Sequence, residues 1–231
     1  MIGRVGDDSF GSTLLENFEK EYVNTDHIDR VENTPSGLAN IILSEKDNRI
    51  IIISGANAHV TPSYIERSKS VIIDSDYVLL QFEIPRETIE YCLQICSEHG
   101  IPVIVNPAPA MNLSEKSWEQ ATFITPNATE RKQLFDEEWK EKLIVTRGKE
   151  GVSFIENGKE KLIPSHSVDV VDTTGAGDTF NGAFAVALAR GLPIEAAVRF
   201  ANAAAALSVG QLGAQGGMPA KEQVEEILAK G

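Results

Sequence analysis

A glycine-bearing loop that runs directly into a helical stretch is the part of the sequence best suited to chemistry. Residues 172–182 read Asp-Thr-Thr-Gly-Ala-Gly-Asp-Thr-Phe-Asn-Gly. The small residues Gly175, Ala176 and Gly177 leave backbone N–H groups free to face a ligand, and the helix dipole adds positive charge, which predicts an anion cradle. Asp178, kept ionised by that dipole, suits a general base for phosphoryl transfer. The alternative is that Asp178 only caps the helix and the glycines only form a turn.

Other motifs of phosphate, metal or thiol chemistry are missing. Neither G-x-x-x-x-G-K-[ST] nor G-x-G-x-x-G occurs in the sequence. Cys92 and Cys96 fall on one face of an expected helix, and we interpret them as reduced thiols. The four histidines are scattered without the spacing of metal ligands, which argues against a zinc site.

Composition limits the class of protein. The chain has 231 residues with 34 acidic and 21 basic side chains, and its net charge of -13 argues against a nucleic-acid partner. The longest strongly apolar run, 50–53, is far shorter than the ~20 residues of a membrane-spanning helix. No secretory signal is visible at the N-terminus, so we expect a cytoplasmic protein that folds as one domain, 1–231.

Short β-branched runs alternate with helical stretches, as in an α/β fold with a mainly parallel sheet. The polar residues 44–48 separate two such runs and predict an antiparallel hairpin, a small β flap over 38–53. The expected strands are 38–43, 50–53, 77–82, 103–106, 122–124, 143–146 and 152–155. The expected helices are 8–21, 179–190, 193–209 and 221–230, with others beginning near 62, 85, 114 and 127.

Residues 172–182 closely resemble the C-terminal signature of the ribokinase-like sugar kinases. Segments 2–11, 106–110, 125–130 and 213–219 agree with that family in order, so the resemblance covers essentially the whole chain. It implies a three-layer α/β/α fold and transfer of the γ-phosphoryl group of ATP to the 5-hydroxyl of D-ribose, with Mg²⁺ on the phosphates. It also implies a homodimer paired through the flap. A related sugar or nucleoside kinase and a non-catalytic nucleotide-binding fragment remain alternatives.

The resemblance also implies roles for individual residues. Asp178 would be the catalytic base in contact with the sugar, and Gly175, Ala176 and Gly177 would form the anion hole. Glu83 would contact the sugar, and Glu130 would organise magnesium through its waters. The implied nucleotide-binding residues are Asn127, Thr146, Arg147, Gly148, Lys149, Glu150, Gly151, Gly177 and Asn202. The implied ligands of a monovalent cation, K⁺, are Asp172, Thr174, Ser208, Gln211 and Gly213.

The residues alone allow plainer interpretations of these positions. Asn127 and Glu130 have the spacing of a helix capping box, and 146–151 has the form of an ordinary hairpin turn. Asn202 would be a polar residue on a packed helix, and Asp172 would cap its own loop. Glu83 would be a charge near the start of a helix.

The sequence departs from the family at its beginning. It starts at a point inside the first third of a typical member, so we expect the leading strands, an early sugar-binding aspartate and a G-G-K-G-x-N segment to be absent. The only adjacent glycines are Gly216 and Gly217, in the C-terminal signature. A second departure is the short connection 131–142, where the family has a further helix. Loss of leading strands would expose apolar strand and helix faces.

Overall fold

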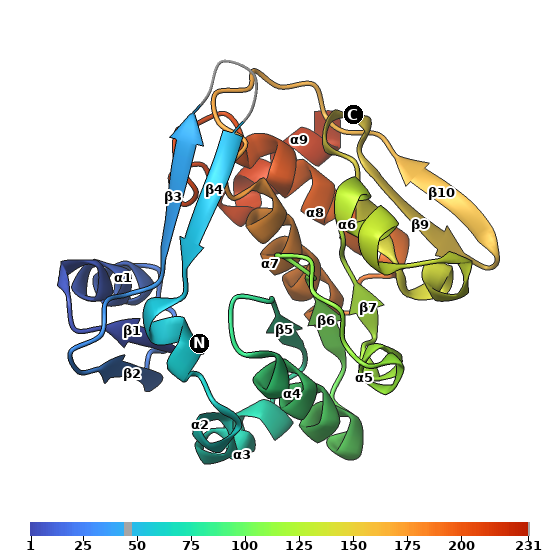
Figure 1. Ribbon diagram of the computed structural model, residues 1–231. Helices are drawn as coiled ribbons and strands as arrows, with labels where there is room; N and C mark the ends of the chain where they lie inside the picture. Colours follow the sequence, from blue (N-terminus) through green and yellow to red (C-terminus); the bar gives the residue numbers. More distant parts are fainter. Residues whose placement is uncertain (44–47, 231) are drawn as a thin grey trace. The chain divides into compact units, whose positions relative to one another are not determined.

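The computed structural model describes residues 1–43 and 48–230, which form two compact units (Figure 1). Unit 1 contains Met1–Ser75 and Gln81–Gly100, and unit 2 contains Asp76–Leu80 and Ile101–Gly231. The expectation of a single domain concerns how the two combine and stays a prediction.

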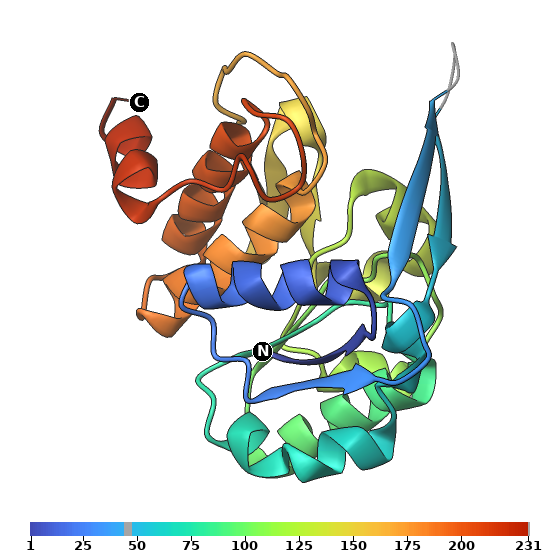
Figure 2. The ribbon, with the colours of Figure 1, turned by 90° about the vertical axis from the view of Figure 1, so that its left-hand side faces the viewer.

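Unit 1 begins with two parallel strands joined by a helix. Strands β1 (Ile2–Gly6) and β2 (His27–Val31) pair in parallel, and α1 (Ser9–Lys20) lies over them (Figure 2). The side chain of Asp8 caps α1 by accepting a hydrogen bond from the N–H of Gly11 at 2.8 Å. The remaining helices of unit 1 are η1 (Gly55–His59), α2 (Pro62–Arg67), α3 (Lys69–Ile73) and α4 (Arg86–His99).

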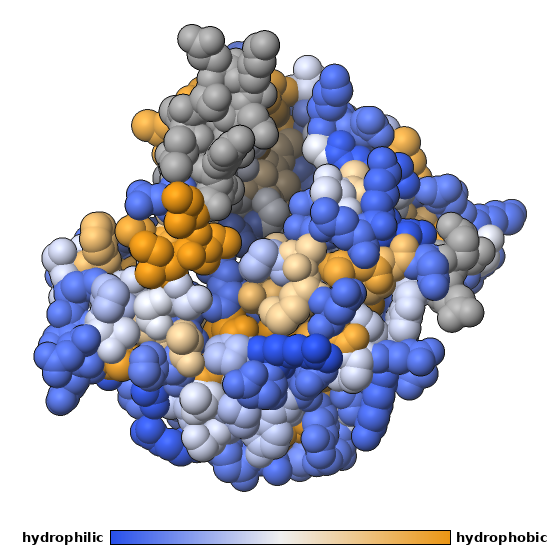
Figure 3. Space-filling model, viewed as in Figure 1, coloured by the Kyte–Doolittle hydropathy of each residue, from blue (hydrophilic) through white to orange (hydrophobic). Residues whose placement is uncertain are grey.

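The predicted hairpin is confirmed. Strands β3 (Leu38–Leu43) and β4 (Asn48–Ile53) pair antiparallel. Of the predicted turn 44–48, Asn48 belongs to β4 instead, and residues 44–47 lie outside the described residues. Figure 3 shows apolar surface gathered at the lower part of this hairpin. The exposed apolar side chains there are Leu38, Ile51, Ile52 and Ile53, with exposed fractions of 39%, 52%, 45% and 47%.

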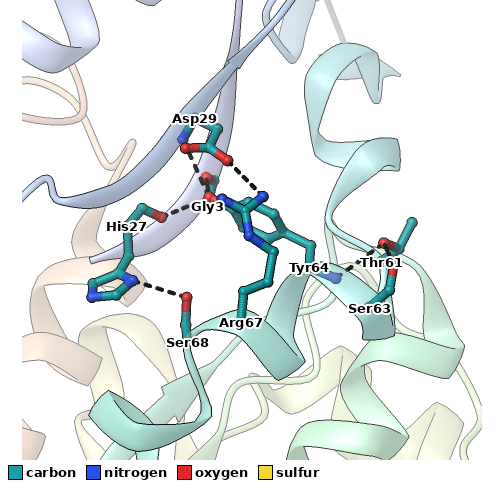
Figure 4. Close-up of polar contacts among 8 residues, drawn as sticks. All are labelled: Gly3, His27, Asp29, Thr61, Ser63, Tyr64, Arg67 and Ser68. Carbon is teal, nitrogen blue, oxygen red and sulfur yellow. Dashed lines mark hydrogen bonds and ion pairs between the residues drawn. The ribbon is translucent and has the colours of Figure 1, made fainter.

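The side chain of Tyr64, on α2, ties the helix to both strands of the β1–β2 pair. Its hydroxyl lies 2.7 Å from the carbonyl oxygens of Gly3 and His27 and accepts the N–H of Asp29 at 3.2 Å (Figure 4). Arg67 forms an ion pair with Asp29 at 3.2 Å. Because Tyr64 is 4% exposed, these polar groups depend on its hydroxyl rather than on water.

Unit 2 combines a parallel and an antiparallel sheet. Strands β5 (Val78–Leu80), β6 (Val103–Val105) and β7 (Phe123–Ile124) are parallel, while β8 (Ile144–Thr146), β9 (Val152–Glu156) and β10 (Lys159–Ile163) are antiparallel. Isolated parallel bridges join Ile124 to Leu143 and Asn127 to Thr146. All seven predicted strands are present; β1, β2 and β10 were not predicted.

The core of unit 2 lies where its two long helices meet the strands. Helices α7 (Ala176–Ala189) and α8 (Ile194–Ser208) pack side by side (Figure 1). Phe180 and Phe184 on α7 are buried in the same cluster as Ile104 of β6 and Ile144 of β8. The other helices are α5 (Glu115–Gln120), α6 (Ala128–Leu134), η2 (Glu137–Lys142), η3 (Gly148–Glu150) and α9 (Lys221–Lys230). None of the helices in the described ranges has the length and apolar character needed to cross a membrane.

Candidate active site

The first turn of α7 carries no capping side chain. Its N-cap residue, Gly175, has φ +81°, and a Cβ at this position would lie 2.4 Å from the carbonyl oxygen of Ala214. Glycine is therefore required here by both backbone conformation and space. The N–H of Ala176 donates weakly to the carbonyl of Thr173 at 3.3 Å, whereas those of Gly175 and Gly177 meet no backbone carbonyl in the described part of unit 2.

Asp178 lies on the exposed side of this turn. None of the described residues of unit 2 gives it a hydrogen bond, and the surrounding protein, by removing water, raises the pKa of its carboxyl above the ordinary 3.8. This direction differs from the expectation that the helix dipole dominates. A raised pKa makes the carboxylate a better proton acceptor.

Asn127 and Glu130 form the predicted capping box at the start of α6. The side-chain oxygen of Asn127 accepts the N–H groups of Thr129 and Glu130 at 2.8 and 2.9 Å. The two carboxylate oxygens of Glu130 accept the backbone N–H and the side-chain amide of Asn127, both at 2.8 Å. Glu130 is 9% exposed, and burial raises the pKa of its carboxyl.

Residues 146–151 connect the antiparallel strands β8 and β9, as the plainer interpretation expects. Gly148 has φ +55° and Gly151 has φ +105°, so the turn depends on glycine. The side chain of Arg147 donates to the hydroxyl of Ser153 at 2.8 Å and pairs with Glu160 at 3.4 Å. The side chain of Arg147 therefore binds to residues of strands β9 and β10.

Hydrogen bonds join the three predicted motifs at one end of unit 2. The hydroxyl of Thr125 donates to the side-chain oxygen of Asn181 at 2.6 Å, which connects the end of β7 to α7. The N–H of Thr146 donates to the carbonyl of Pro126 at 3.0 Å, which places the 146–151 turn beside Asn127. No role was predicted for Thr125 or Asn181. A buried asparagine within the apolar face of a helix was the available signal.

Hydrogen bonds to the carboxylate of Asp172 bring together three of the five implied cation ligands, from the loop before α7 and the loop after α8. The carboxylate of Asp172 accepts the N–H and hydroxyl of Thr174 at 2.9 and 2.7 Å and the N–H of Gly213 at 2.9 Å. These hydrogen bonds hold the pKa of Asp172 below its usual range. The hydroxyl of Ser208 donates instead to Ala205, within α8, and Gln211 is exposed.

The two remaining predicted residues are Asn202 and Glu83. Asn202 is 5% exposed and donates to the carbonyl of Pro164 at 2.8 Å, as the packed-helix alternative expects. Glu83 belongs to unit 1 and is exposed.

Metal-ligating and thiol clusters add nothing to this site. Within the described ranges, no group of three or more His, Cys, Asp or Glu side chains is placed to hold a metal ion. Cys92 and Cys96 are free thiols buried on α4. Burial raises the pKa of Cys92 to about 12 and that of Cys96 to about 11, so both stay protonated.

Comparison with known proteins identifies the family. Residues 1–221 match the family described as pfkB family carbohydrate kinase. Ribokinase of Bacillus subtilis is 49% identical over 237 residues, which cover 99% of this chain and 81% of the relative. The crystal structure of ribokinase from Thermotoga maritima has a TM-score of 0.87 at 39% identity, covering 99% of this chain and 80% of that one. Arabidopsis thaliana ribokinase, solved with ribose and ATP, has a TM-score of 0.88 at 31% identity, covering 98% and 80%.

The chain belongs to the pfkB family of carbohydrate kinases. The structural similarity confirms the predicted ribokinase-like α/β fold. Residues 172–182 lie within the matched range, and the match confirms the resemblance to the ribokinase-like sugar kinases.

Proposed function

We propose that this chain is an ATP-dependent sugar kinase that transfers the γ-phosphoryl group of ATP to the 5-hydroxyl of D-ribose and yields D-ribose 5-phosphate. The ribokinases of 49% and 31% identity support this substrate pair, since the second was solved with ribose and ATP. The observation that carries the proposal is the meeting, at one end of unit 2, of an uncapped helix turn, the Asp178 carboxylate and the Asn127–Glu130 box.

The chemistry follows from what these groups can donate and accept. The sugar hydroxyl attacks the γ-phosphorus, an O–P bond forms, the bond to the β,γ-bridging oxygen breaks, and ADP leaves. Asp178 accepts the hydroxyl proton, and its raised pKa suits that role. The N–H groups of Gly175 and Gly177, aided by the helix dipole, stabilise negative charge on the transferring group. Ala176 contributes less because its N–H is shared with Thr173.

Two cations fit the residues to different degrees. Each carboxylate oxygen of Glu130 carries one hydrogen bond and keeps a lone pair, so Glu130 suits the ordering of magnesium-bound waters. Magnesium bound with the nucleotide would neutralise charge on its phosphates. For K⁺, Asp172 already accepts three hydrogen bonds, so backbone carbonyls of the Ser208, Gln211 and Gly213 segment would supply most of the ligands.

The remaining roles follow the family resemblance. Thr146, the 147–151 backbone and Asn202 would contact the nucleotide, and Glu83 would contact the sugar. The exposed isoleucines of β4 support a homodimer formed through the β3–β4 hairpin, because water disfavours such a surface. Sedimentation of the chain as a monomer would contradict the dimer. A cytoplasmic location stays a prediction from the sequence, which cell fractionation tests.

The decisive experiment measures ribose-dependent ADP formation by this 231-residue chain, beside calorimetric titration with a non-hydrolysable ATP analogue. We expect turnover that falls by about 10²–10⁴-fold in Asp178→Asn, with binding of the analogue retained. We also expect kcat/KM to rise with pH through the pKa of Asp178. Turnover of a different sugar or of a nucleoside, but not of ribose, would assign the chain that substrate instead. Nucleotide binding without any turnover would indicate a nucleotide-binding fragment.

A further inference from the structure

Asn181 connects two parts of the candidate active site through its side-chain amide. It is 4% exposed and lies on α7 one turn after Gly177. Its nitrogen donates to the carbonyl of Gly177 at 2.9 Å, and its oxygen accepts the hydroxyl of Thr125 at 2.6 Å. Thr125 is 2% exposed and stands two residues before Asn127.

The Thr125 hydroxyl donates its proton to the side-chain oxygen of Asn181. Its alternative acceptor, the carbonyl of Val105, lies at 3.3 Å, against 2.6 Å for the Asn181 oxygen. The backbone of Thr125 is itself fixed, since its N–H donates to Val105 at 2.8 Å and its carbonyl accepts the side chain of Asn106 at 3.1 Å. Asn181 is therefore bonded to the residue that directly follows β7, whose backbone is held by hydrogen bonds to Val105 and Asn106.

The first turn of α7 has to be held in place without a side chain that caps its N–H groups. The turn consists of Gly175, Ala176 and Gly177, which have little side chain to fix them. An ordinary capping side chain would occupy the N–H groups, as Asn127 does on α6. Asn181 holds the turn from its carbonyl side and leaves the N–H groups available to a phosphoryl group.

We propose that Asn181 is a positioning residue, which together with Thr125 fixes the anion-binding turn and Asp178 relative to the Asn127–Glu130 box. This inference rests on the proposed kinase function. A base and a nucleotide site that are held on separate elements must keep their spacing, because misplacement by about 1 Å costs on the order of 10²-fold in rate. The Thr125–Asn181 bond is the direct connection between those elements.

The test compares Thr125→Val, which removes the hydroxyl at nearly constant shape, with Thr88→Val. Thr88 is a matched control in unit 1: it is 0% exposed and its hydroxyl donates to Val60 at 2.7 Å. We expect the melting temperature to fall by a similar amount in both variants. Only in Thr125→Val should kcat fall, by about 10–100-fold, with a smaller change in the KM for ATP. Thr125→Ser, which keeps the hydroxyl, restores kcat.

A second measurement does not depend on turnover. Hydrogen exchange of the amide of Thr179, which donates to the carbonyl of Gly175 at 2.9 Å, is expected to accelerate in Thr125→Val and in Asn181→Leu, with no further increase in the double variant. Equal kcat in Thr125→Val and Thr88→Val, or unchanged exchange at the amide of Thr179, would overturn the positioning role. If the wild-type chain phosphorylates no sugar, the proposed function fails, while the exchange comparison still decides whether Asn181 fixes the turn.

Discussion

Replacing Gly175 with alanine tests the central geometry of the candidate site. A Cβ at Gly175 would lie 2.4 Å from the carbonyl oxygen of Ala214, whereas ordinary contact begins at 3.4 Å, so the two backbones must separate by about 1 Å. The left-handed φ of +81° adds a cost of roughly 1–2 kcal/mol for any residue with a Cβ. A shift of that size at the anion-binding turn lowers kcat by about 100-fold.

Gly182→Ala is the matched control for this substitution. Gly182 lies on the same helix, and a Cβ there meets no atom within 4 Å. We expect that variant to keep full activity. Its free energy of unfolding should rise by about 0.5–1 kcal/mol, because alanine has a higher helix propensity than glycine. The assay pairs ribose-dependent ADP release with thermal unfolding followed by circular dichroism. Equal kcat and equal melting temperature in the two variants would refute the reasoning.

Two further predictions concern unit 1. Tyr64→Phe should lower the free energy of unfolding by about 2 kcal/mol in urea titrations, because the partly buried N–H of Asp29 loses its acceptor. Tyr91→Phe, whose hydroxyl is bonded at the surface, should lower it by less than about 0.5 kcal/mol. Equal losses in the two variants would contradict this prediction. Hydrogen bonds, above all from the N–H of Ser36, lower the pKa of Asp8, so folding stability from Asp8 is present above pH 3.8 and is lost as the pH falls through the folded-state pKa. Wild type should therefore lose stability more steeply below pH 3.8 than Asp8→Asn in melts at several pH values, and parallel curves would disprove it.

The strands show which parts of the fold a local sequence pattern can predict and which parts it cannot. The expected strands β6 and β8 are buried apolar runs, which the sequence marks clearly. Strand β10, by contrast, reads Lys-Glu-Lys-Leu-Ile and is largely exposed, and β1 contains Gly3 and Arg4. Such segments become strands because a partner supplies the hydrogen bonds, and the partner is not encoded in their own residues.

The sequence by itself determined the family signature, the Asn127–Glu130 capping box and the antiparallel hairpin, because each depends on residues a few positions apart. Only the tertiary structure decided that Thr125 meets Asn181, 56 residues away, and that Arg147 turns its side chain to Ser153. The same holds for Gly175, whose need for glycine comes from the carbonyl of Ala214. These contacts depend on how separate elements pack, and packing distances between segments far apart in the chain leave no local pattern in the residues that make them.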